Sequence, residues 1–275
     1  MGNVGETPIQ LMPFRLPEPN SVGPRPARIL IAHPGRQHSH QTALALLESG
    51  LLGCYATGVP VSQIQLSAPW RGLVRRYSSH EEVAVPPQLT RLNMLAPVVN
   101  RLTRCLPEFT AQPIYYETLG IFDRWVAGLI ARNHFDGVIA YENSALHTFR
   151  AAKKSGAKCI LDAASLHRAE ADSRYEPTLP DAYQARMNRL KDFEVDLADC
   201  IFTTSELAAQ SYRVNIGRER CVKAIILGAD IDRFTPNPNR DCIKAPYQMF
   251  TFVFVGTATV RKGFDCLLES MDILL

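Results

Sequence analysis

The residues Gly137–Asp162, GVIAYENSALHTFRAAKKSGAKCILD, decide the fold of this chain. Two short, mainly apolar runs, Gly137–Ala140 and Lys158–Leu161, are typical of strands that are buried on both faces of a parallel sheet. Between them, the polar turn Tyr141–Ser144 leads into a predicted helix that ends at Gly156. A strand, a helix and a second strand in this order indicate an α/β protein with a parallel sheet.

Further strands and helices are predicted on both sides of this unit. Arg28–Ala32 has the composition of a buried strand, and Leu44 and Leu47 mark a helix that ends at Gly50. Additional strands are predicted at residues 53–59 and Val222–Ile226, and helices at 118–130 and 183–197. The sequence therefore predicts a Rossmann-like, doubly wound parallel sheet within residues 28–235.

The remaining chain divides into three parts. Residues 1–27 contain six prolines and no periodicity, so we expect an extended arm. Residues 236–248 are rich in proline and asparagine and have the composition of a linker. Within 249–275, Thr251–Val255 predicts a buried strand, and apolar side chains recur at helical spacing over Phe264–Leu275. We therefore expect the first strand and helix of a second Rossmann-like domain.

Composition narrows the class of protein. The 275 residues are 46% hydrophobic, which is enough for a core, and a net charge of +3 does not indicate a nucleic-acid binder. No stretch approaches 18 consecutive apolar residues, and the first 28 residues lack the apolar segment of a signal peptide. Seven scattered cysteines without a CxxC pattern favour reduced thiols over a zinc site or a disulfide framework. We therefore expect a cytoplasmic protein.

The segment Trp70–Leu106 is strongly basic. It contains six arginines and two glutamates, which gives it a charge of about +4, and it carries an apolar stripe in which Pro97 is expected to kink a helix. One interpretation is a pair of surface helices that cover the sheet. The other is a surface that contacts anionic lipid headgroups or a phosphorylated acceptor, as a peripheral protein at the inner face of a membrane would.

Polar loops follow the predicted strands at their carboxyl ends. The loop His33–His40 follows the first strand, Glu142 and Asn143 follow the strand at 137–140, and Asp162, Ser165 and His167 follow the next strand. Ligands of doubly wound sheets bind at this edge, so we expect these loops to converge on one site.

Simpler interpretations of these residues stay open. Three histidines in eight residues suggest a metal site, but the loop brings no carboxylate or cysteine to complete a ligand set. His167 is equally explained as a surface-loop histidine. Glu142 is also explained as an acidic residue placed favourably just before a helix.

A turn between the strand and helix at 249–275 combines features of an anion site. Gly256 and Gly263 are near its ends, and Arg261 and Lys262 stand just before the predicted helix. Free backbone N–H groups, a helix dipole and two cations together favour a phosphate. The alternative is an ordinary turn with two solvated cations, because the turn matches neither GxGxxG nor GxxxxGK[ST].

Three ordered motifs resemble those of the family 4 retaining glycosyltransferases, which have the GT-B fold. The first is Ala198–Glu206 (ADCIFTTSE), the second is Leu227–Pro236 (LGADIDRFTP), and the third extends from Phe254 through Arg261–Gly263 to Leu267–Glu269. Thr257 departs from the pattern, since the family usually has an arginine at that position. The resemblance is clear from about residue 136 onward and weak over 28–58.

The resemblance implies two facing Rossmann-like domains and a retaining transfer of a hexosyl group from a nucleotide-diphosphate sugar, with no metal cofactor. Glu142 and His167 occupy the positions of catalytic residues. The acceptor side would hold His33, Gly35, Gln37 and His38, and the donor diphosphate side would hold Gly256, Arg261, Lys262, Gly263 and Ser205. The acceptor would be a glycan, a lipid-linked molecule or a small molecule.

The resemblance stops within the donor domain. The later acidic motif of the family, two glutamates eight residues apart, has no counterpart before Leu275, so we expect a truncated chain that is a poor catalyst by itself. Two other interpretations remain, a nucleotide-sugar epimerase of the same fold and a non-catalytic interaction module.

Overall fold

A computed structural model describes residues 26–35, 37–59, 85–174, 181–229, 234–235 and 252–274. The chain forms two compact units, Met1–Leu227 and Gly228–Leu275. Each unit is described here by itself.

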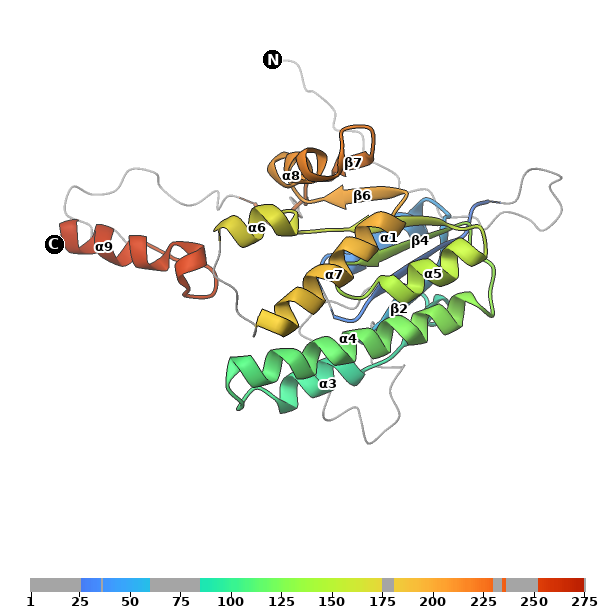
Figure 1. Cartoon of the computed structure of the whole chain (residues 1–275), viewed down its shortest axis with the longest axis horizontal. Helices are drawn as coiled ribbons and strands as arrows, with labels where there is room; N and C mark the ends of the chain where they lie inside the picture. Colours follow the sequence, from blue (N-terminus) through green and yellow to red (C-terminus); the bar gives the residue numbers. More distant parts are fainter. Residues whose placement is uncertain are drawn as a thin grey trace, which may run out of the picture. The chain divides into compact units, whose positions relative to one another are not determined.

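A seven-stranded sheet forms the first unit, in the order β3-β2-β1-β4-β5-β6-β7 (Figure 1). Every neighbouring pair is parallel. The strands are β1 (Ile29–His33), β2 (Leu52–Thr57), β3 (Thr90–Leu92), β4 (Gly137–Tyr141), β5 (Lys158–Asp162), β6 (Cys200–Thr203) and β7 (Cys221–Ala224). The strand order reverses between β1 and β4, so the predicted doubly wound, Rossmann-like sheet is confirmed.

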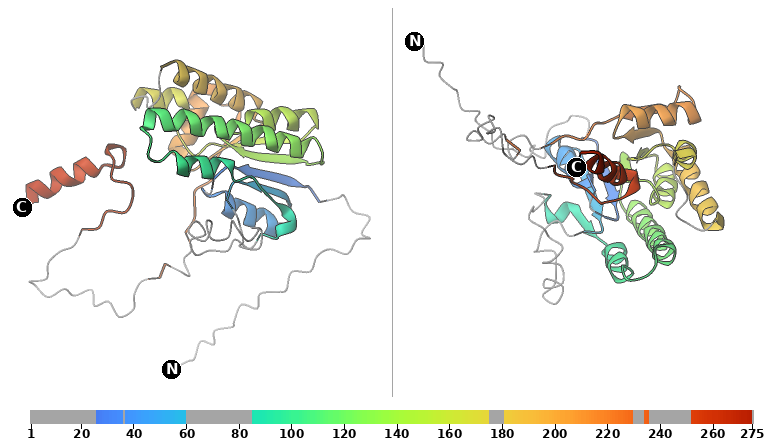
Figure 2. Two further views of the ribbon diagram at one scale, coloured as in Figure 1. Left: turned by 90° about the horizontal axis from the view of Figure 1, so that it is seen from below. Right: turned by 90° about the vertical axis from the view of Figure 1, so that its left-hand side faces the viewer.

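Helices cover both faces of this sheet (Figure 2). On one face, α4 (Glu108–Ile130), α5 (Leu146–Lys154), α7 (Asp181–Leu197) and α8 (Glu206–Ile216) share the larger core with residues such as Val138, Leu161 and Ile201. On the other face, α1 (Ser39–Glu48) packs over Ile31, Tyr55 and Ile139. Because successive side chains of a strand point to opposite faces of the sheet, the strands contribute residues to both cores.

Shorter elements complete the unit. They are the 3-10 helix η2 (Pro87–Leu89), α3 (Leu95–Leu102) and α6 (Arg168–Arg174). Pro97 lies in the first turn of α3, where a missing N–H costs no helical hydrogen bond, so the kink that we predicted there is wrong. The apolar stripe does not form one helix either, because residues 90–92 are the edge strand β3 and α3 begins after it. Residues 60–84, with Arg71, Arg75 and Arg76, lie outside the described residues.

The second unit contains the 3-10 helix η3 (Val260–Lys262) and α9 (Phe264–Leu274). The helix agrees with the sequence analysis, but the strand at Thr251–Val255 does not form over the described residues 252–255. Val253 is 78% exposed and Val255 is 90% exposed. A buried parallel strand needs partners on both sides, and the described part of this unit supplies none.

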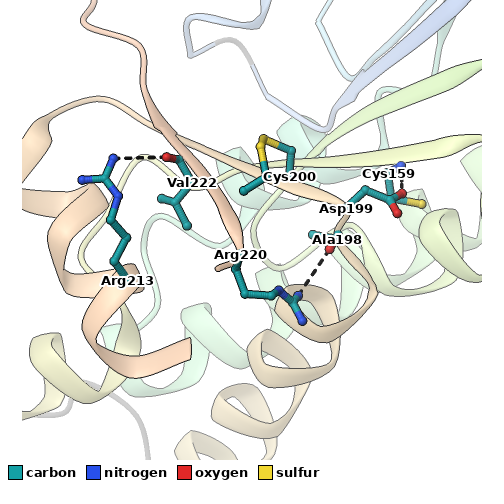
Figure 3. Close-up of a disulfide and its surroundings, with 8 residues drawn as sticks. Cys159, Ala198, Asp199, Cys200, Arg213, Arg220 and Val222 are labelled. Carbon is teal, nitrogen blue, oxygen red and sulfur yellow. Dashed lines mark hydrogen bonds between the residues drawn. A yellow bond between two sulfur atoms is a disulfide. The ribbon is translucent and has the colours of Figure 1, made fainter. Parts of the chain in front are cut away.

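A disulfide joins Cys200 and Cys221 (Figure 3). The two cysteines begin β6 and β7 and are paired directly in the register of these strands. The expectation of reduced thiols is therefore wrong for this pair. Because the pairing arises from strand register, it cannot be seen in the spacing of cysteines along the chain.

Hydrogen bonds hold the ends of β6 and β7 around this disulfide. Arg220 donates to the carbonyls of Val195 (2.7 Å) and Ala198 (3.3 Å), and Arg213 donates to the carbonyl of Val222 (3.1 Å; Figure 3).

In the described part of the chain, no helix combines the length and the hydropathy that crossing a bilayer requires.

Candidate active site at the carboxyl edge of the sheet

The loops that follow β1, β4 and β5 meet at the carboxyl edge of the sheet, where the strand order reverses. The backbone N–H of Glu142 donates to the carbonyl of Asp162 at 3.4 Å, which ties the β4 loop to the end of β5. His38, from the β1 loop, reaches the Asp162 side chain. The structure thus brings together residues that are more than 100 positions apart in the chain.

His38 and Asp162 form the best-defined polar pair of this edge. His38 Nε2 lies 2.9 Å from Asp162 Oδ2, and both side chains are largely buried. The hydrogen bond that His38 donates to the Asp162 carboxylate raises the pKa of His38, although burial acts against it. An imidazole that is oriented and made more basic by a carboxylate is suited to accept a proton from a substrate.

Tyr141 lies between two histidines of the β1 loop. Its ring is edge-on to the rings of His33 (centroids 4.5 Å apart) and His38 (5.3 Å). Its buried hydroxyl lies beside Thr42 and Asp162 without a hydrogen bond of ordinary geometry to either, and burial raises the pKa of Tyr141. The phenol therefore keeps its proton beside the His38–Asp162 pair.

His33 is held as a neutral ring. The N–H of Gly35 donates to His33 Nδ1 at 2.8 Å, which leaves the ring proton on Nε2. Burial is the largest cause and lowers the pKa of His33, and the N–H group donated to Nδ1 also favours the neutral ring. His40, the third histidine, lies in the first turn of α1 and is buried against Tyr55. The ring nitrogens of the three histidines therefore have different partners, and the described residues contain no cluster of three or more histidine, cysteine or acidic side chains suited to a metal.

Glu142 is fixed by two donors. Ser165 donates to Oε2 at 2.6 Å, and the Tyr212 hydroxyl of α8 donates to Oε1 at 2.8 Å. Burial, followed by the charge of Glu142, raises the pKa of Tyr212, so the phenol keeps the proton that it donates. The side-chain contacts of Glu142 are therefore made with the loop after β5 and with α8.

His167 is 8% exposed, so the surface-loop interpretation is wrong. Its backbone N–H donates to Ser211 Oγ at 2.9 Å, and its ring is edge-on to Tyr212 with centroids 5.2 Å apart. Burial and the neighbouring Arg168 lower the pKa of His167. Tyr212 thus contacts both residues that we proposed as catalytic.

Two buried acids that the sequence analysis did not assign support the β4 loop. Glu194 of α7 accepts hydrogen bonds from the N–H groups of Asn143 and Ala145, both at 2.8 Å. Asp123 of α4 accepts from the N–H groups of His147 and Thr148, both at 2.7 Å. Together they satisfy four backbone donors at the start of α5. The sequence contains one signal for Glu194, because this acidic residue falls on the apolar stripe of the predicted helix 183–197.

These acids also hold an unusual backbone conformation. Asn143 has a positive φ of 69°, a left-handed conformation that costs free energy in residues other than glycine. Its side-chain Oδ1 is buried without a hydrogen bond. Burial raises the pKa of Glu194 to about 8, although the two N–H donors act against it.

The β1 loop is pressed against the end of β2. The N–H of Gly58 donates to the carbonyl of His33 at 3.2 Å. A Cβ atom at Gly58 would lie 1.9 Å from the carbonyl oxygen of Pro34 and 2.7 Å from its carbon. This close backbone approach admits only glycine and fixes the loop that carries His38.

The residues proposed for the donor side fall in both units. Ser205 caps α8, where its Oγ accepts from the N–H of Ala208 at 3.2 Å. In the second unit, Gly263 has a left-handed conformation (φ 70°) and ends η3, and α9 begins directly after it. Lys262 is exposed beside this helix start, and the side chain of Arg261 lies outside the described part. Gly256 also has a positive φ, of 147°.

Comparison with known proteins gives only distant likenesses. No family model and no curated protein matches the chain. Matching solved structures include a UDP-N-acetylglucosamine 2-epimerase (9% identity, TM-score 0.42, 73% of this chain and 48% of that one). UGT2 of Phytolacca americana, complexed with UDP-2fluoro-glucose and pterostilbene, matches with 12% identity and a TM-score of 0.40 over 76% of this chain and 56% of that one.

A UDP-glucosyltransferase from Polygonum tinctorium, described as capable of glucosylating indoxyl, matches with 13% identity and a TM-score of 0.41, covering 79% of this chain and 56% of that one. The chain thus spans about half the length of these structures. Likenesses at this level carry no argument about function. The site is therefore interpreted from its own geometry.

Proposed function

We propose that the chain belongs to a glycosyltransferase that moves a sugar from a nucleotide-diphosphate sugar to an acceptor hydroxyl with retention of configuration. The observation that carries the proposal is the convergence of Glu142, His167 and the His38–Asp162 pair at one edge of the sheet. Doubly wound proteins bind ligands at this edge. The site offers a carboxylate and imidazoles that buried neighbours hold in fixed orientations.

The charges of the reaction suit these groups. As the bond between sugar and phosphate breaks, the sugar gains positive character and the diphosphate gains negative charge. We propose that Glu142, with His167 beside it, stabilises the positive charge on the sugar. We assign the negative charge of the diphosphate to Lys262 and to backbone N–H groups near Gly256 and at the start of α9, without a metal, since one such donor commonly lowers a barrier by about 3 kcal/mol.

The His38–Asp162 pair favours a second mechanism on the same substrates. A histidine made basic by a buried carboxylate can remove the proton of the acceptor hydroxyl as that oxygen attacks the sugar directly. A single displacement inverts the anomeric configuration. The configuration of the product, determined by NMR, distinguishes the two mechanisms, and conversion of the donor sugar without transfer would indicate an epimerase.

Activity measurements on two variants test the proposal. Release of nucleoside diphosphate from a panel of nucleotide sugars would be measured in a longer protein that includes residues 1–275. Glu142→Gln and Asp162→Asn should each lower kcat by about 10²-fold, because each removes a charge at the reacting groups. Glu206→Gln is the control, since Glu206 pairs with Arg213 at the surface of α8. Unchanged activity in both site variants would reject the proposed site.

A peripheral membrane contact through residues 70–106 is part of the proposal for the acceptor. In the described portion of this segment, Arg91 donates to the carbonyls of Gln88 and Thr90, both at 2.9 Å. Arg104 is exposed. Flotation with anionic vesicles tests this contact, and equal recovery with neutral vesicles at low salt would contradict it.

A further inference from the structure

A polar groove lies between α4 and α5. It is open and has a volume of about 700 Å³. It is lined by the small side chains of Ala127, Ala131 and Ala151 and by the basic residues Arg124, Arg132, Arg150 and Lys154, together with His134 and His147. The residues that line it include no aspartate or glutamate.

The groove extends along α4 and α5 from His147, in the first turn of α5, toward the amino edge of the sheet. Helix α4 ends at Ile130, before β4 begins, and α5 ends at Lys154, before β5 begins. The carboxyl ends of both helices therefore lie near the amino edge of the parallel sheet. Arg132 and Lys154 lie at that end of the groove, whereas the candidate active site lies at the carboxyl ends of the strands. The inference therefore does not depend on the proposed function.

The side chains of the four groove cations make no hydrogen bond or ion pair within the described structure, although the charge of Arg124 acts on Glu117. Two cations outside the groove are paired: Lys153 with Asp199 at 2.7 Å and Arg186 with Glu117 at 2.6 Å. Lys153 and Lys154 are adjacent in sequence, and only Lys154 lines the groove. Like charges gathered around a concavity repel one another, and a bound anion relieves that repulsion.

The cations form two rows along the helices. His147, Arg150 and Lys154 are spaced by three and four residues on α5, so they share one face of that helix. Arg124 lies on α4, and Arg132 follows the end of that helix by two residues. Seven to eight helical residues correspond to about 11–12 Å. This length suits several linked anionic groups better than one ion.

We propose that this groove binds a small, soluble polyanion that carries several phosphate groups. The small alanine side chains leave space for the chain of phosphates, and the guanidinium groups that line the groove can bind the phosphate oxygens in a bidentate manner. A flat bilayer surface does not enter a concave groove, which favours a soluble ligand over a membrane.

Calorimetric titration with sodium tripolyphosphate and with inorganic phosphate tests the proposal. The wild-type chain should bind tripolyphosphate at least tenfold more tightly than phosphate, and higher salt should weaken binding. Arg150→Gln combined with Lys154→Gln should weaken tripolyphosphate binding at least tenfold. Glutamine is a good helix former at these exposed positions, and a thermal melt checks that the fold is retained.

The matched control removes two other positive charges, from residues that do not line the groove. Lys153→Gln combined with Lys158→Gln should change the affinity less than threefold, because neither side chain lines the cavity. Equal weakening by both double variants would overturn the proposal, as would phosphate binding as tightly as tripolyphosphate. Binding of anionic vesicles that depends on Arg150 and Lys154, without tripolyphosphate binding, would assign the groove to a membrane surface and also overturn it.

Discussion

At the scale of single residues, Glu194 has a strongly constrained environment. It is fully buried, and its carboxylate accepts the N–H groups that begin the turn after β4. The neighbouring charges of Asp123 and Glu142 add to the effect of burial in raising its pKa to about 8. The same residue therefore supports the loop of Glu142 and retains its proton at a pH where an ordinary carboxyl group has lost it.

This raised pKa predicts a pH dependence of stability. Between about pH 4.5 and pH 8 the folded state holds a proton that the unfolded state has released, so the free energy of unfolding should fall as pH rises through this range. Each unit of pKa difference corresponds to about 1.4 kcal/mol. Glu194→Gln should be less stable than wild type at pH 5 and should show a flatter pH profile in urea unfolding.

Asp192→Asn serves as the control for this profile, because Asp192 pairs with Arg168 in a partly exposed position. It should retain the slope of the wild type. A Glu194→Gln profile as steep as that of the wild type would show that another group titrates.

At the scale of elements, β7 is the edge strand at one end of the sheet and is attached on one side only. The Cys200–Cys221 disulfide adds a covalent link at the start of its pairing with β6. Removing the link should increase the conformational freedom of the unfolded chain between the two cysteines, which are 21 positions apart.

We predict that the double variant Cys200→Ser/Cys221→Ser lowers the free energy of unfolding by about 2–4 kcal/mol under oxidising conditions. Chemical denaturation measures the loss. Cys105→Ser, at an exposed free cysteine, is the control and should change stability little. If a reducing agent leaves the stability of the wild type unchanged, the link does not stabilise the fold.

The elements show which parts of the fold follow from the sequence. Periodicity predicted β1, β4, β5 and the helices between them, because buried parallel strands and amphipathic helices leave regular local patterns. The three-residue strand β3 is too short to leave such a pattern. The cysteine pair and the hydrogen bonds from Tyr212 to Glu142 depend on tertiary structure, and no local pattern encodes them.

At the scale of the whole molecule, the proposed reaction needs a donor site in the second unit. None of the described residues of α9 is buried, and Val253 and Val255 beside the turn are exposed. Few groups in this part of the chain can therefore order a nucleotide. An isolated helix of about 11 residues is also marginal in water.

We predict weak binding of nucleoside diphosphates to residues 1–275, with little effect of Lys262→Ala. In a protein with a complete second domain, the same substitution should lower kcat by about 10²–10³-fold, because the contact strengthens as the diphosphate leaves. Calorimetry measures the binding of nucleoside diphosphates, and steady-state kinetics measures kcat. Lys158→Ala serves as the control. Tight binding to the 275-residue chain that Lys262→Ala abolishes would contradict the first expectation.

The close contact between Gly58 and the Pro34 carbonyl restricts how this chain can vary over evolution. Every substitution at position 58 adds a carbon atom where the oxygen of Pro34 already lies, so it displaces the loop that carries His38 toward or away from Asp162. In a library of random variants selected for activity, position 58 should stay glycine as strictly as the residues that touch substrate. An alignment of active relatives would then mark Gly58 as a site residue, although it has no side chain to offer a substrate.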